Sequence, residues 1–78
     1  MFLSIAGKNL QQINDWVNSD LKEYEPNCLI NTGERLVYSF SKGSPSPADL
    51  SRLSYLQERK ELSFDWKNEM PLDNFKTR

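Results

Sequence analysis

The side chains that most often carry chemistry are few in this sequence. Its 78 residues include no histidine and one cysteine, Cys28. A histidine general base and a histidine-containing catalytic triad are therefore excluded. A structural zinc site built from cysteine and histidine ligands is excluded for the same reason, and a single cysteine cannot form an internal disulfide.

Cys28 is the one candidate nucleophile of this kind. It stands between Asn27 and Leu29 in a stretch that predicts a β-strand. A reactive thiolate needs a basic neighbour or a helix N-terminus, and the sequence places neither beside it. We therefore expect Cys28 to be a small buried hydrophobic residue.

Carboxylates around the first predicted helix form a second candidate group. They are Asp15, Asp20, Glu23 and Glu25. Paired carboxylates can serve as general acid and base, but these lie on or near the polar side of the helix and alternate with Lys22, which is typical of a solvated surface. The segment 41–44 has neither the glycine spacing nor the following lysine of a phosphate-binding loop. The sequence thus predicts a protein that is not an enzyme and holds no cofactor or metal.

The elements that must position these side chains follow from hydrophobic periodicity. Strands are expected at residues 1–6, 28–30, 35–41 and 62–66, and the 28–30 and 35–41 segments form a hairpin around Gly33. Helices are expected between Asn9 and Pro26 and from Ser46 to about Lys60. The order is therefore β-α-β-β-α-β.

Both helices carry a start signal and an apolar stripe. Asn9 is the expected N-cap of the first helix, and its stripe is Leu10, Ile13, Val17, Leu21 and Tyr24. In the second helix, Ser46 and Asp49 have the spacing of a capping box around Pro47 at the first helical position. Its apolar residues are Leu50, Leu53 and Leu56.

This order predicts a small α+β two-layer sandwich, ferredoxin-like or similar, with both helices on one face of a mainly antiparallel sheet. The domain is expected at 1–66, and 67–78 is expected to be a C-terminal tail that either docks on the domain or stays loose. The helix-covered face is expected to carry Leu36, Tyr38, Phe40, Leu62, Phe64 and Trp66. The open face is then left with Ser4, Ser39, Ser41, Ser63 and Asp65.

Several aromatic and apolar residues fall outside the expected core stripes. Trp16 lies to one side of the first stripe, and Tyr55 points away from the leucines of the second helix. Met70, Leu72 and Phe75 interrupt the polar tail. Each has a purely structural interpretation. Trp16 packs at the margin between helix and sheet, Tyr55 is a single exposed aromatic residue, and the three tail residues dock on their own domain. Each is also a candidate partner contact, because tryptophan and tyrosine are enriched at binding hot spots.

Charge and length narrow the function further. The formal net charge is −1, with ten basic and eleven acidic side chains, and no basic patch of the kind that binds nucleic acid is visible. No apolar run approaches the ~20 residues of a membrane span. We therefore expect a cytoplasmic protein-binding module (host cytoplasm if the protein is viral) that regulates or inhibits a larger partner. A module of this kind is typical of a phage or mobile-element protein that targets a host factor. The alternative is a nucleic-acid-binding accessory domain.

Overall fold

Residues 1–69 form four β-strands and two α-helices in the order expected from the sequence. The computed structural model describes residues 1–69, so Met70, Leu72 and Phe75 lie outside the described residues. The strands are β1 (Phe2–Gly7), β2 (Pro26–Asn31), β3 (Arg35–Phe40) and β4 (Leu62–Lys67). The helices are α1 (Gln11–Asp20) and α2 (Ser51–Glu58), and a 3₁₀ turn, η1 (Lys22–Tyr24), follows α1.

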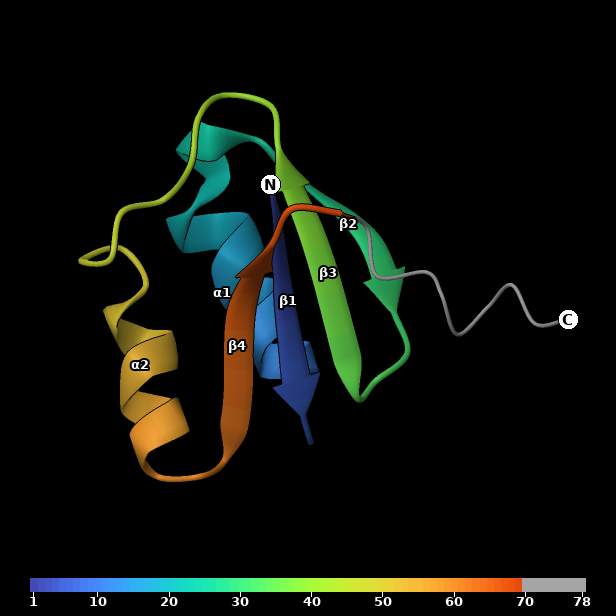
Figure 1. Ribbon diagram of the computed structural model, residues 1–78, viewed down its shortest axis with the longest axis vertical. Coiled ribbons are helices and arrows are strands. Elements are labelled where there is room, and N and C mark those ends of the chain that lie inside the picture. The colour runs from blue at the N-terminus through green and yellow to red at the C-terminus, as the bar shows by residue number, and fades with distance from the viewer. Residues whose placement is uncertain (70–78) are drawn as a thin grey trace, which may run out of the picture.

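The four strands form one sheet in the order β2-β3-β1-β4. All three neighbouring pairs are antiparallel. β3 therefore lies between β1 and β2, and β1 lies between β3 and β4, which is the split β-α-β arrangement of a ferredoxin-like sandwich. Figure 1 shows α1 behind the strands and α2 beside β4. The expected two-layer α+β fold is confirmed.

The strand register places the apolar side chains on the face that the helices cover. Leu3 of β1 lies between Tyr38 and Trp66, and Ile5 lies between Leu36 and Phe64. Because side chains alternate along a strand, these residues share one face. Leu3, Ile5, Leu36 and Tyr38 are fully buried, and Phe64 and Trp66 pack against the same cluster. The helix-facing residues were therefore predicted correctly.

Helix α1 buries the stripe that its sequence predicts. Leu10, Ile13, Val17 and Leu21 belong to the core. Its start differs from the expectation, because Asn9 has a φ of 55° and an N-cap residue normally has an extended backbone. Leu10 takes the cap position instead and forms no side-chain cap.

A side-chain hydrogen bond joins α1 to strand β3 of the sheet. The hydroxyl of buried Tyr38 donates a hydrogen bond of 2.6 Å to the side-chain oxygen of Asn14 on α1. Burial raises the pKa of Tyr38, so the hydroxyl keeps its proton and remains a donor. A buried hydroxyl without a partner would cost free energy, and Asn14 removes that cost.

The capping box at Ser46 forms as predicted. The backbone N–H of Asp49 donates to Ser46 Oγ at 3.2 Å, and the backbone N–H of Ser46 donates to Asp49 Oδ2 at 3.0 Å. These bonds close a turn, and the regular helix begins only at Ser51. The helix ends at Glu58 instead of about Lys60, because Lys60 has a left-handed backbone with φ 63°.

Asp49 also ties this turn to η1. The Tyr24 hydroxyl donates a hydrogen bond of 2.6 Å to Asp49 Oδ2. This hydrogen bond lowers the pKa of Asp49 below its usual 3.8, and the hydrogen bonds from Ser46 lower it further, each by a smaller amount. Stability gained from such a group is present above its unfolded-state pKa and is lost as pH falls through the folded-state pKa. We therefore expect Asp49 to contribute to an acid-induced loss of stability below about pH 4.

The measurement is the urea midpoint of unfolding between pH 7 and pH 2. The Asp49→Asn variant should be less stable than wild type at pH 7, and the difference should shrink below pH 4. Glu58→Gln makes the same chemical change at an exposed carboxylate on α2 and should follow wild type. A constant gap between wild type and Asp49→Asn at every pH would show that the Asp49 carboxylate does not couple protonation to folding.

The open face is less solvated than the sequence predicts. Ser4 is buried, and the guanidinium of Arg35 donates a 2.8 Å hydrogen bond to its hydroxyl. Val37, which is opposite Ser4 in the register, is also fully buried. Both residues lie on the two central strands, which have a neighbouring strand on each side. Ser63 and Asp65 on the outer strand β4 are exposed as expected.

Cys28 is exposed, so the expectation that it is buried is wrong. It is opposite Tyr38, but β2 is the outermost strand of the sheet and so has a neighbouring strand on one side only within residues 1–69. Partial burial raises the pKa of Cys28, so the neutral thiol is the favoured form near pH 7. The thiolate needed for nucleophilic chemistry is therefore not stabilised.

Candidate protein-contact surface

The outward side of α2 presents the most exposed aromatic side chain among the described residues. Tyr55 is 58% exposed, as its position off the leucine stripe predicts. Its neighbour Leu53, two positions back, is fully buried and holds the helix on the sheet. One side of α2 therefore packs on the sheet, and the opposite side leaves the ring of Tyr55 in solvent.

Arg59 contacts the Tyr55 ring and is itself paired with Glu61. The Arg59 guanidinium lies 5.6 Å from the centre of the ring, in a cation–π arrangement, and donates a long hydrogen bond of 3.4 Å to the hydroxyl. Arg59 Nε in turn donates to Glu61 Oε2 at 2.7 Å. This bond raises the pKa of Arg59. We call these three residues the Tyr55 cluster.

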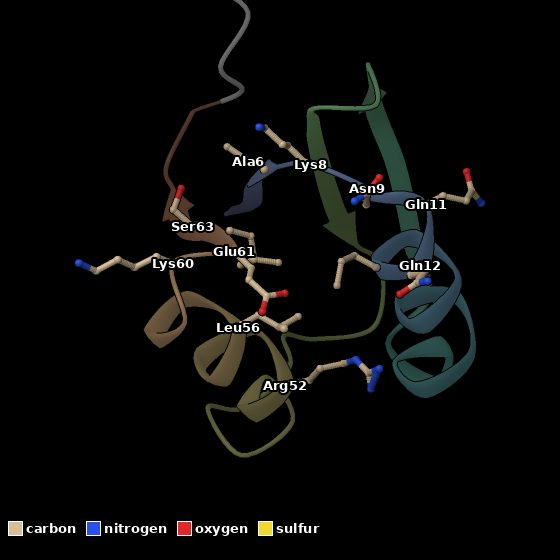
Figure 2. A pocket seen from close by; sticks show the side chains of 13 residues that line it. Ala6, Lys8, Asn9, Gln11, Gln12, Arg52, Leu56, Lys60, Glu61 and Ser63 are labelled. Carbon is tan, nitrogen blue, oxygen red and sulfur yellow. The ribbon is translucent and has the colours of Figure 1, made fainter.

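A cleft of about 1170 Å³ opens between the two helices. Its apolar lining consists mainly of Ile13, Leu56 and Leu62, and Figure 2 shows it from close by. Helix α2 forms one wall and the start of α1 the other. The cleft and the Tyr55 cluster therefore share α2, with Glu61 belonging to both.

Cations outnumber acids around this cleft. Its lining includes Lys8, Arg52, Lys60 and Glu61. Within residues 1–69 none of the three cations forms an ion pair, whereas Glu61 is paired with Arg59. Figure 2 shows Arg52 extending toward α1 while Lys8 and Lys60 project outward. The cations therefore give the mouth a positive potential but do not converge on one anion site.

Trp16, the other aromatic candidate in the described residues, packs against the core. It is partly buried and contacts the core cluster. The structure thus supports its interpretation as margin packing. The tail candidates Met70, Leu72 and Phe75 are outside the described residues, so Tyr55 alone is placed on an open surface.

The carboxylates near α1 lie on a solvated surface, as expected. Asp15, Asp20, Glu23 and Glu25 are all exposed. Asp15 accepts a hydrogen bond from Gln11, and Glu25 pairs with Lys42. Across residues 1–69, no group of three or more cysteine, aspartate or glutamate side chains lies close enough to hold a metal ion.

Two features of the surface were not predicted from the sequence. The first is the support that Arg59 and Glu61 give to Tyr55. The four-residue spacing of Tyr55 and Arg59 on a helix could have indicated it, because side chains four apart are neighbours. The second is the cleft, for which the sequence has no signal because it depends on how far apart the helices lie.

No protein-family model matches the chain, and comparisons with curated proteins and with solved structures find no match either. Within the described residues, no helix is both long and apolar enough to cross a membrane.

Proposed function

We propose that this protein is a protein-binding module that docks on a larger partner through the outward side of α2. Tyr55 is the central contact in this proposal. By occupying a surface of its partner, the module acts as a regulator or inhibitor. A phage or mobile-element protein acting on a host factor is the setting that fits its small size.

The observation that supports this proposal is the Tyr55 cluster. Tyrosine and arginine are among the residue types that dominate binding energy at protein interfaces. Binding usually costs free energy because exposed side chains must be ordered. The contacts of Arg59 with Tyr55 and Glu61 already restrict these side chains before a partner arrives.

The Tyr55→Ala variant is expected to lose partner binding while keeping its fold. The wild-type chain, immobilised and exposed to a lysate of the native host, should retain a protein that the variant does not. Calorimetric titration of the purified partner should show at least a roughly 30-fold weaker Kd for Tyr55→Ala, which corresponds to the about 2 kcal/mol of a hot-spot residue.

The matched control is Leu29→Ala, which removes an exposed apolar side chain from β2 instead of α2. It should bind the partner as wild type does. Circular dichroism should show that both variants are folded. Equal affinity of wild type and Tyr55→Ala for every retained protein would contradict the proposal.

The alternative function, nucleic-acid binding, is supported by Lys8, Arg52 and Lys60 at the cleft, none of which forms an ion pair within residues 1–69. Binding driven by phosphates falls steeply with salt concentration because counterions are released. If the chain binds single-stranded DNA or RNA with a steep salt dependence, Arg52→Ala should weaken binding and Tyr55→Ala should not. That pattern would replace the protein-binding proposal.

A further inference from the structure

Within residues 1–69, strand β2 has a neighbouring strand on one side and an unpaired edge on the other. It is the outermost strand on one side, with β3 as its neighbour on the other. None of its six residues, Pro26–Asn31, is charged. Cys28 and Leu29 are exposed, and the side chain of Leu29 is one of three large hydrophobic side chains exposed within residues 1–69, at 43% exposure. Such an edge has no like charges to repel a second strand.

Backbone groups of β2 point outward from the sheet. The hydrogen bonds Ser41 N–H to Glu25 O and Thr32 N–H to Arg35 O mark hydrogen-bonded positions at the two ends of the β2–β3 pair. Hydrogen-bonded and non-bonded pairs alternate along an antiparallel ladder. By this alternation, and with the register shift between Cys28 and Ile30, the N–H and C=O groups of Cys28 and Asn31 face away from β3.

The opposite edge of the sheet is protected. On β4, the backbone N–H of Phe64 donates to the side chain of Gln57 at 3.0 Å. The N–H of Trp66 donates to the side chain of Asp65 at 2.9 Å. These side chains occupy two of the outward N–H donors of β4, whereas no side chain within residues 1–69 occupies the outward N–H groups of β2.

We propose that β2 pairs antiparallel with β2 of a second copy of this chain about a two-fold axis, which joins the two sheets into one. In this arrangement two identical uncharged strands lie side by side, so no like charges repel each other across the contact. Pairing of β2 with β4 of another copy would build an open filament, but it would first have to break the bonds that occupy the Phe64 and Trp66 donors of β4. The assembly therefore stops at two copies.

The contact is expected to be small. Pro26 supplies no N–H donor, and the bulge between Cys28 and Ile30 interrupts the regular ladder. An interface of this size gives weak association, so we expect the dimer to form between about 10 µM and 1 mM. This inference does not depend on the proposed function, because β2 and α2 are different surfaces.

Sedimentation equilibrium of the full chain under reducing conditions tests the pairing. The mean mass should rise from 9.1 kDa toward twice that value over this concentration range. In the same range, hydrogen exchange of the Cys28 and Asn31 amides should slow as concentration rises. The Leu29→Lys variant, which adds a cation to each facing strand, should stay at the monomer mass.

Two variants serve as controls. Ser54→Lys adds the same charge at an exposed position on α2 and should dimerise as wild type does. Cys28→Ser should also dimerise, which excludes an intermolecular disulfide as the cause. A wild-type mass of one chain up to 1 mM, or a Leu29→Lys variant that dimerises like wild type, would overturn the inference.

Discussion

Replacing Leu53 with alanine is expected to lower the free energy of unfolding by about 2–5 kcal/mol, the range measured for truncating a buried leucine. Leu53 is fully buried and is the only residue of α2 in the buried core. Truncation leaves a cavity between α2 and the sheet. A domain of this size has only a few kcal/mol of stability, so the variant should be partly unfolded at 37 °C.

Urea denaturation at 25 °C measures this loss, with Tyr55→Ala as the matched control on the same helix. Tyr55 is exposed, so its truncation should change stability by less than about 0.5 kcal/mol. The pair also separates the side of α2 that packs on the core from the side that the proposal places in contact with a partner. Equal losses in the two variants would show that the side of α2 facing the core is misassigned.

The Gly7→Ala variant is expected to be less stable by about 1–3 kcal/mol, the usual cost of overpacking. Gly7 is paired with Leu62 where β1 and β4 approach closely. A Cβ atom at residue 7 would lie 2.9 Å from Leu62 Cβ and 3.0 Å from the Glu61 carbonyl oxygen. Neither atom is the end of a flexible side chain, so the strands themselves must move apart.

Thermal unfolding of Gly7→Ala is compared with that of Ser39→Ala, a substitution in a paired strand where alanine removes an atom instead of adding one. Ser39→Ala should keep the wild-type Tm to within a few degrees. Gly7→Ala should melt clearly lower. A Gly7→Ala variant as stable as wild type would mean that β1 and β4 are not held at the described spacing.

Local signals in the sequence were sufficient for most of the fold. The alternation of Leu36, Tyr38 and Phe40 placed the apolar face of β3 correctly, because a strand has a fixed two-residue period. The capping box of Ser46 and Asp49 formed as predicted, because it depends on residues three apart in the chain. Tyr55 was placed on the surface by the helical period alone.

Features that depend on distant parts of the chain were missed. Cys28 was expected in the core, but its exposure depends on the position of β2 at the sheet edge. The burial of Ser4 depends on Arg35, thirty-one residues away along the chain. The support of Tyr55 by Arg59 and Glu61 requires both the helix and the turn that follows it. Neither sheet order nor turn geometry follows from periodicity.

The most direct test of the proposed function is NMR shift mapping of the labelled chain with the partner retained from the host lysate. We expect the largest amide shifts between Ser51 and Glu61, centred on Tyr55, and small shifts on the open face of the sheet. Shifts confined to the sheet, with the 51–61 amides unchanged, would contradict a contact surface on α2.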